Sequence, residues 1–373
     1  MVSGGPTDSH MTANHHSRTQ QPGAPLNEQL HPVRHGGDLD AATAIHGAPA
    51  AGWIDLSSGI SPFAYPLPKL APEVWTRLPS AARMDELRAL ALSAYGAGER
   101  AHAALAPGAQ ALIDRLPHIG GGHARVGVVS PTYGEHALSW SRNGHAVSEV
   151  TVLPDARDFD VVVLTNPNNP DGRLFSRADL MALADDLGAR EGVLIVDESF
   201  ADVLPHRSLA RETGHRALVI LRSFGKFFGL AGLRLGFALG PGRIVRRVGE
   251  LMGPWPISGP ALEIGLHALA DNGWMEDARA KLTETARRLD ALVRAHGLEV
   301  IGGTPLFRLV GCENARVVHE RLAGDGIWTR RFERAPTWLR LGMPGSDADF
   351  ARLDRALAAI AGETATAGGD ACD

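Results

Sequence analysis

The stretch SFGKFFGLAGLRLG occupies residues 223–236 and places one lysine, Lys226, among glycines and aromatic side chains. Ser223 precedes this lysine by three residues and Arg234 follows it by eight. An amine that attacks a carbonyl needs a fairly dry pocket that lowers its pKa, while a hydroxyl and a guanidinium can together hold a phosphate. The stretch therefore predicts a Schiff-base lysine, and the cofactor that it implies is pyridoxal phosphate.

Two polar sites precede this lysine, each at the end of an apolar run. Residues 193–196 lead into Asp197, and residues 161–165 lead into the sequence NPNNPDG at residues 166–172. Such runs are typical of strands buried in a parallel sheet, and ligands of open α/β sheets bind at the carboxyl ends of the strands. We therefore expect Asp197 to pair with the pyridine nitrogen of the cofactor and Asn169 to contact its phenolic oxygen.

Taken together, these residues resemble the motifs of the fold type I pyridoxal-phosphate enzymes. This is the aspartate aminotransferase superfamily, and the resemblance is to the class that contains the histidinol-phosphate aminotransferases, over roughly residues 35–361. It implies that Lys226 bonds to the cofactor, that Asp197 pairs with the pyridinium and that Asn169 contacts the phenolate. It further implies that Ser223 and Arg234 hold the cofactor phosphate.

Two other segments fit the same resemblance. Gly108, Ala109 and Gln110 follow a proline and open an apolar stretch. They resemble the start of the family's phosphate-binding helix, where free backbone N–H groups favour an anion. Tyr133 resembles the aromatic residue that stacks on the cofactor ring. The implied fold is α/β, with a large domain whose mostly parallel sheet is flanked by helices and a smaller α+β domain, and the implied assembly is a homodimer.

The pattern between residues 125 and 222 supports this fold class independently. Apolar runs alternate with amphipathic stretches, which indicates βαβ units and a parallel sheet. We expect strands at residues 125–130, 160–165, 193–196 and 217–222, with helices at residues 135–142 and 177–190. A long helix is expected at residues 274–296.

The domain boundaries follow from changes in composition. Residues 1–34 are rich in Gly, Pro, Ser, Thr, Gln and His, so we expect a disordered tail there. We assign residues 73–257 to the large cofactor-binding domain, residues 35–72 and 258–361 to the small domain, and residues 362–373 to a flexible C-terminal tail. The active site should lie in the cleft between the two domains.

A narrower resemblance comes from three other segments. The sequences HGGD at residues 35–38, WIDLSSGISP at residues 53–62 and PWPIS at residues 254–258 resemble the threonine-phosphate decarboxylases of cobalamin biosynthesis. These enzymes remove the α-carboxylate of threonine O-3-phosphate and give aminopropanol phosphate. The first hypothesis is therefore a pyridoxal-phosphate-dependent decarboxylase, a lyase acting on a small phosphorylated amino acid.

Two alternatives remain at this point. The second hypothesis is an aminotransferase that acts on histidinol phosphate or a related amine and needs a keto-acid acceptor. The third is a binding or regulatory protein on a retired enzyme scaffold, which is disfavoured because Lys226, Asp197, Asn169 and Arg234 are all present. In a pyridoxal-phosphate enzyme the Cα bond that stands perpendicular to the ring plane is the one that breaks. Positioning therefore decides between the first two hypotheses.

Substrate recognition is expected to rest on arginines of the small domain. Arg340, in the sequence TWLRLG, resembles the arginine that grips the substrate carboxylate in this superfamily, and a planar guanidinium suits a bidentate contact. Arg330 is our candidate for the substrate phosphate, with His35 closing over it and Asn169 also touching the substrate. We expect three other arginines to be surface charges: Arg308, Arg331 and Arg334.

Two residues depart from the family pattern. Phe200 stands where many relatives have a tyrosine, so a hydroxyl contact to the cofactor oxygen is absent. Leu78 stands where relatives often have a tyrosine that reaches the cofactor phosphate of a neighbouring subunit. Neither change removes a group that the chemistry requires.

Composition excludes several other classes of protein. The 373-residue chain has a formal charge of −5 with both signs interspersed, so neither a nucleic-acid footprint nor a membrane-surface patch is indicated. Its two cysteines make no disulfide framework and no zinc-ligand spacing, and we expect no metal site. No apolar run approaches the roughly 20 residues that span a bilayer. With no signal-peptide pattern at its start, the protein is expected to be cytoplasmic.

Overall fold

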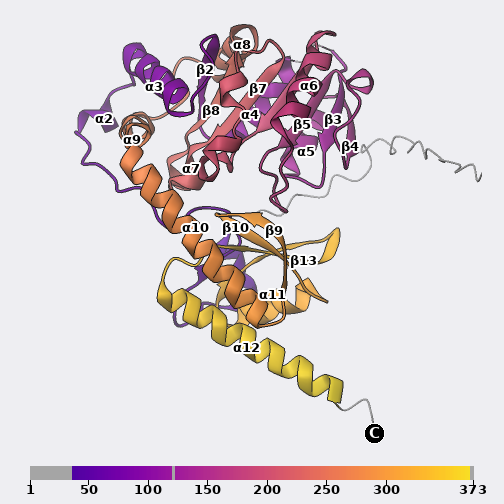
Figure 1. The fold of residues 1–373 in the computed structure, drawn as a ribbon. Helices are drawn as coiled ribbons and strands as arrows, with labels where there is room; N and C mark the ends of the chain where they lie inside the picture. Colours follow the sequence, from indigo (N-terminus) through magenta and orange to yellow (C-terminus); the bar gives the residue numbers. More distant parts are fainter. Residues whose placement is uncertain (1–35, 120–121, 370–373) are drawn as a thin grey trace, which may run out of the picture.

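This computed structural model describes residues 36–119 and 122–369. Its central sheet has seven strands and lies in the upper body of Figure 1. The strand order is β2-β8-β7-β6-β5-β3-β4. Six strands run in the same direction, and β8, which lies between β7 and β2, runs antiparallel to both. The mostly parallel α/β sheet is therefore confirmed. The strands are β2 (Ala101–Ala106), β3 (Arg125–Val129), β4 (Ala146–Val150), β5 (Val161–Thr165), β6 (Val193–Asp197), β7 (Leu218–Ser223) and β8 (Gly236–Pro241).

Helices cover both faces of this sheet, which explains its continuous apolar strands. In β5, Val162 and Leu164 pack on one side, while Val161 and Val163 pack on the other, because successive side chains of a strand point to opposite faces. The first face is covered by α3 (Ala81–Ala94), α6 (Arg177–Gly188) and α9 (Gly259–Ala270). The second is covered by α4 (Ala109–Arg115), α5 (Glu135–Arg142) and α8 (Gly242–Met252).

The predicted elements of this region lie within two residues of the observed ones. The helix at residues 135–142 is correct at both ends, and the one predicted to reach residue 190 ends at Gly188. Glu191 then adopts a left-handed turn (φ 61°), which no helix can include. The long helix, α10 (Asn272–Ala295), begins two residues earlier than predicted because Asp271 caps it by accepting a hydrogen bond from the Trp274 amide.

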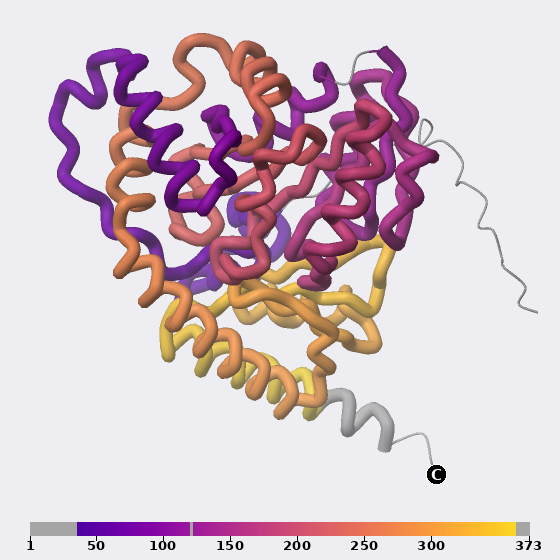
Figure 2. Tube along the Cα trace, turned by 45° about the horizontal axis from the view of Figure 1, so that its top comes forward, coloured from indigo at the N-terminus to yellow at the C-terminus, as the bar shows by residue number. Residues whose placement is uncertain are grey.

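A second, antiparallel sheet lies in the lower body of Figure 1, in the order β12-β13-β10-β9. Its strands are β9 (Glu299–Thr304), β10 (Phe307–Gly311), β12 (Arg330–Phe332) and β13 (Ala335–Gly342), accompanied by α11 (Ala315–Gly324) and α12 (Asp347–Gly369). The short strand β1 (Ile54–Asp55), which follows α1 (Leu39–His46), pairs in parallel with β11 (Ile327–Trp328). Figure 2 shows α10 running from the upper body down along the lower one.

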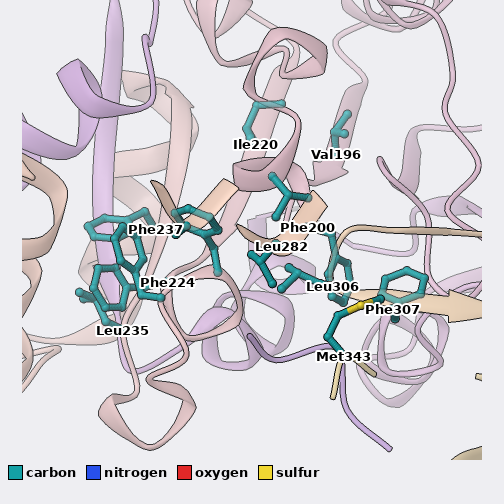
Figure 3. Packing of buried hydrophobic residues seen from close by; sticks show 14 of the residues in the cluster. Val196, Phe200, Ile220, Phe224, Leu235, Phe237, Leu282, Leu306, Phe307 and Met343 are labelled. Atoms are coloured by element: carbon teal, nitrogen blue, oxygen red, sulfur yellow. The ribbon is translucent and has the colours of Figure 1, made fainter. Parts of the chain in front are cut away.

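The two bodies meet beneath the carboxyl ends of the parallel strands. Phe200, three residues after the end of β6, packs edge-on against Phe307 of β10 with ring centroids 5.0 Å apart, and both lie in the buried cluster of Figure 3. Gly172 (φ 72°) lies so close to the small sheet that a Cβ there would be 2.2 Å from the Gly303 carbonyl oxygen. The turn that carries Asn169 is therefore held directly against β9.

The chain between β1 and α2 (Glu73–Thr76) runs along the turn that contains Lys226. The Ser61 amide donates to the Lys226 carbonyl at 2.8 Å, and the Tyr65 amide donates to the Phe228 carbonyl at 2.8 Å. The lysine itself lies on α7 (Phe224–Phe227), the short helix that follows β7. Among the described residues, no helix is long and apolar enough to span a membrane.

Candidate active site

Asp197 lies at the carboxyl end of β6, and three donors hold its carboxylate. Ser199 donates to Oδ1 from its hydroxyl at 2.5 Å and from its amide at 2.9 Å, and Oδ2 lies 3.0 Å from His136 Nε2. Burial opposes ionisation of this carboxyl, but the bonds with His136 and Ser199 outweigh it and hold the pKa of Asp197 below its ordinary value. Because the carboxylate is ionised, His136 Nε2 carries the proton. The carboxylate therefore stays charged in a buried place, as a partner for a pyridinium requires.

Lys226 lies within the electrostatic reach of Asp197, Arg234 and Arg340. Burial, reinforced by the positive charge of Arg340, lowers the pKa of Lys226 to about 8. The ammonium also lies 5.8 Å from the ring centroid of Phe200. With this pKa about a tenth of the amine is unprotonated at pH 7, far more than for a lysine with the ordinary pKa of 10.5, and the unprotonated form is the one that attacks an aldehyde.

Asn169 and Arg340 approach the same point from the two bodies. Arg340 Nη1 donates to the side-chain oxygen of Asn169, and Arg340 Nη2 donates to the Ser57 carbonyl at 2.7 Å. With its oxygen occupied in this way, the Asn169 amide presents its N–H groups elsewhere. Burial, together with the nearby charge of Arg330, lowers the pKa of Arg340 to about 9, and Asp55 opposes this shift.

Several groups converge where the cofactor phosphate is expected. Gly108 (φ 88°) precedes Ala109, the first residue of α4, and a Cβ on Gly108 would lie 2.5 Å from Arg234 Nη2. Gly236 abuts the same turn, since a Cβ there would lie 2.6 Å from the Ala109 nitrogen, and it pairs with Ser223 across the β7–β8 ladder. The two glycines leave room for a hydroxyl, a guanidinium and free N–H groups around one anion. These residues fit a phosphate group.

Tyr133 and Gln110 are hydrogen-bonded to each other beside this cradle. The Tyr133 hydroxyl donates to Gln110 Oε1 at 3.0 Å, and Gln110 Nε2 donates to Asp114 at 3.0 Å. The Tyr133 ring lies edge-on to His136, with centroids 6.0 Å apart. Burial raises the pKa of Tyr133, so its hydroxyl stays protonated. Its stacking on the cofactor ring stays a prediction.

Arg330 and Arg340 lie directly opposite each other on the antiparallel strands β12 and β13. Directly opposed side chains project from the same face of a sheet, and like charges so placed repel each other unless an anion lies between them. His35 lies outside the described residues. Arg308, predicted to be a surface charge, instead forms a largely enclosed ion pair with Asp290 because its side chain folds back against α10.

Four residues near the site were not identified from the sequence. Ser199 follows Asp197 by two residues, a spacing typical of an Asx turn that could have revealed it. His136 is 61 residues from Asp197, and no local pattern marks it. Asp55 and Ser57 lie in a segment that we noted only for its resemblance.

Phe200 and Leu78, the two departures from the family pattern, lie in different surroundings: Phe200 is buried and Leu78 is exposed. Phe200 is buried, and a Cβ on Gly59 would lie 2.8 Å from its Cε1 atom, so the ring fills the space above that glycine. Leu78 is 66% exposed, which leaves it available to another molecule.

Comparisons of sequence and fold show which known proteins this chain is similar to. The family model of aminotransferase class I and II matches residues 67–360. The chain is 43% identical over 328 residues to the threonine-phosphate decarboxylase of Pseudomonas aeruginosa, covering 87% of this chain and 97% of that protein. It is 40% identical over 333 residues to the threonine-phosphate decarboxylase of a Sinorhizobium species, covering 88% and 98%. The histidinol-phosphate aminotransferase of Sinorhizobium meliloti, solved in complex with pyridoxal-5'-phosphate, has a similar fold, with a TM-score of 0.73 at 21% identity over 87% of this chain and 95% of its own.

Proposed function

The chain belongs to the aminotransferase class I and II family, and we propose that it decarboxylates L-threonine O-3-phosphate with pyridoxal 5'-phosphate as cofactor. The product is (R)-1-aminopropan-2-yl phosphate, an intermediate of corrinoid (cobalamin) synthesis. The observation that carries this function is the identity of 43% and 40%, along nearly the whole length, to two threonine-phosphate decarboxylases. The protein is accordingly a pyridoxal-phosphate-dependent lyase.

The residues around Lys226 suit the cofactor. When bound, pyridoxal phosphate supplies an electron sink for the charge that remains on Cα as the carboxylate leaves as carbon dioxide. Lys226 would bond to its aldehyde, and Asp197 would hold the protonated ring nitrogen. Asn169 would donate to the phenolic oxygen. The phosphate would lie in the cradle formed by Ser223, Arg234 and the start of α4, namely Gly108, Ala109 and Gln110, beside Tyr133.

Two arginines suit the two anionic ends of the substrate. Arg340 would hold the carboxylate, and Arg330, opposite it on β12, would hold the phosphate, with Asn169 and His35 as further contacts. An anion between these guanidinium groups relieves their mutual repulsion. After loss of carbon dioxide, Lys226 is the general acid that returns a proton to Cα, and a pKa of about 8 suits this role near neutral pH.

The assembly and location belong to the same proposal. A homodimer is supported by a group of exposed apolar side chains around α2 and the start of α9: Leu67, Trp75, Leu78 and Trp255, exposed by 65%, 68%, 66% and 54%. Surfaces of this kind mark protein–protein contacts. The location that we propose is the cytoplasm, where phosphorylated metabolites are made and used.

Product analysis tests the function. Purified holoenzyme is incubated with L-threonine O-3-phosphate, with and without 2-oxoglutarate, and the products are separated. Aminopropanol phosphate and carbon dioxide formed without the keto acid support the decarboxylase. Glutamate formed from histidinol phosphate and acceptor, with no turnover of threonine phosphate, would make the protein an aminotransferase.

A further inference from the structure

Ser57 contacts both the N-terminal segment at Gly37 and the substrate-binding candidate Arg340, which the proposed function does not connect. Its hydroxyl accepts a hydrogen bond from the Gly37 amide at 2.7 Å and donates one to Asp55 Oδ1 at 2.6 Å. The Ser57 amide donates to the same carboxylate oxygen at 2.8 Å. Since the hydroxyl has a single hydrogen and Gly37 supplies a donor, the direction of the chain is fixed from Gly37 through Ser57 to Asp55. Ser57 is only 1% exposed, so water does not compete for these bonds.

The carbonyl of the same residue holds the substrate arginine. Arg340 Nη2 donates to the Ser57 carbonyl at 2.7 Å. Gly36 also lies against that carbonyl, because a Cβ on Gly36 would be 2.3 Å from its oxygen. Only glycine permits this approach. One residue is thus held by the N-terminal strap, which we define as residues 36–46, and by Arg340.

Further contacts tie the strap to the same region. Trp53 Nε1 donates to Thr43 Oγ1 of α1 at 2.8 Å, and the His46 ring lies 5.7 Å from that of Trp328. Trp328 is the direct partner of Asp55 in the β1–β11 pair. The strap is therefore docked on the segment that carries Asp55 and Ser57.

We propose that Asp55 and Ser57 are positioning residues that couple docking of the N-terminal strap to the orientation of Arg340. Asp55 fixes the hydroxyl of Ser57, the hydroxyl holds Gly37, and the carbonyl of Ser57 fixes one N–H of Arg340. Coupling of this kind is reciprocal, so a change at Arg340 loosens the strap as well. The catalytic consequence rests on the proposed function, because it takes Arg340 as the group that binds the substrate carboxylate.

Hydrogen exchange measured by mass spectrometry on the ligand-free holoenzyme tests the coupling. Ser57→Ala and Asp55→Ala are each expected to raise the exchange rate of residues 36–46 about tenfold, the factor that corresponds to losing one net hydrogen bond. Asp55→Asn keeps an oxygen acceptor for Ser57 and should leave exchange close to wild type. Ser58→Ala, in the neighbouring serine, is the matched control and should change nothing. Far-UV circular dichroism checks that each variant is folded.

The reciprocal arm uses Arg340→Ala. This variant should also accelerate exchange of the strap, and the effects of Ser57→Ala and Arg340→Ala should not multiply in the double variant. The proposal would be overturned if the strap exchanged no faster in Ser57→Ala than in Ser58→Ala. It would also be overturned if the increases in exchange rate caused by Ser57→Ala and Arg340→Ala multiplied fully in the double variant.

Steady-state kinetics extend the test to the reaction. Ser57→Ala should raise the KM for L-threonine O-3-phosphate about tenfold with a smaller fall in kcat, because without the hydroxyl the Ser57 carbonyl no longer fixes Arg340 firmly in the orientation that binds the substrate carboxylate. An unchanged KM would overturn the catalytic consequence. The exchange experiment contains no substrate, so its result stands even where the wild-type protein proves not to decarboxylate threonine phosphate.

Discussion

The acidity of Lys226 sets the pH at which the protein takes up its cofactor. Burial and the charge of Arg340 favour the neutral amine, while Asp197 favours the ammonium, and the balance puts the pKa at about 8. Only the neutral amine attacks an aldehyde. The environment of one residue therefore converts an ordinary lysine, with a pKa of 10.5, into a nucleophile at neutral pH.

We expect the rate of covalent cofactor binding by the apoprotein to rise with pH and to level off above about pH 8. Below that pKa a growing fraction of Lys226 is protonated and unreactive, so the rate falls as the pH falls. Stopped-flow absorbance after mixing apoprotein with pyridoxal phosphate measures the profile, and Lys226→Ala supplies the baseline. A rate that keeps rising to about pH 10.5 would show that the pocket does not perturb the lysine.

Gly59 and Phe200 are matched to each other. A Cβ on Gly59 would lie 2.8 Å from Phe200 Cε1 and 3.1 Å from Phe307 Cδ1, and both rings are fixed in the core. We therefore expect Gly59→Ala to lower the free energy of unfolding by about 1–3 kcal/mol through overpacking. Urea denaturation of the holoenzyme measures it. The control is Gly324→Ala in α11, where a Cβ meets nothing within 4 Å. This variant should leave the free energy of unfolding unchanged or raise it. An equal decrease in both variants would show that contact with Phe200 and Phe307 is not what excludes a side chain at residue 59.

The ends of β6 and β7 are joined by a buried ionic network. Arg222, the penultimate residue of β7, donates from Nη1 to Glu198 at 2.8 Å and from Nη2 to Asp202 at 2.6 Å. All three side chains are almost fully buried. Glu198 follows Asp197 directly and Arg222 precedes Ser223 directly. The network therefore holds the two strand ends that present these groups to the cofactor.

Replacing Arg222 with methionine would leave two buried carboxylates without their cation. We expect Arg222→Met to cost about 3–5 kcal/mol of unfolding free energy near pH 7. Burial already raises the pKa of Glu198 against the opposing charge of Arg222, so losing that charge raises it further. A carboxyl whose pKa is higher in the folded state favours folding at low pH, and that contribution disappears as the pH rises through the folded-state pKa. The deficit should therefore shrink on acidification.

Chemical denaturation at several pH values measures this deficit. The matched control is Arg125→Met, which breaks the exposed pair of Arg125 with Asp160 and should change stability little. Similar losses in the two variants would mean that the buried network contributes no more than a surface ion pair.

Strands and helices with strong local patterns could be predicted from the sequence. β5 and β6 are continuous apolar runs because both of their faces are covered, and their polar termini identified Asn169 and Asp197. Arg340, singled out within the sequence TWLRLG, lies on β13. Contacts between distant residues could not be predicted, because His136 and Asp197, or Ser57 and Arg340, meet only through tertiary packing and carry no local pattern.

At the scale of the whole molecule, four of the nine large apolar side chains that are exposed among the described residues lie in or beside α2 and just before α9: Leu67, Trp75, Leu78 and Trp255. Figure 1 shows these elements on the side of the upper body that carries α3. A Cβ on Gly259, the first residue of α9, would lie 2.1 Å from the Val74 carbonyl oxygen, so α2 and α9 form one continuous surface. Trp75 and Leu78 project from it with 68% and 66% exposure.

We expect Trp75→Glu combined with Leu78→Glu to convert the proposed homodimer into a monomer. A dimer buries such side chains, and two charges on each copy would have to be desolvated without partners at the interface. Size-exclusion chromatography with light scattering measures the mass, which should halve. Val317→Glu, on the exposed face of α11, adds the same charge elsewhere and should leave the mass unchanged. If the double variant kept the wild-type mass, the subunits would associate through another surface; a monomeric wild type would refute the dimer itself.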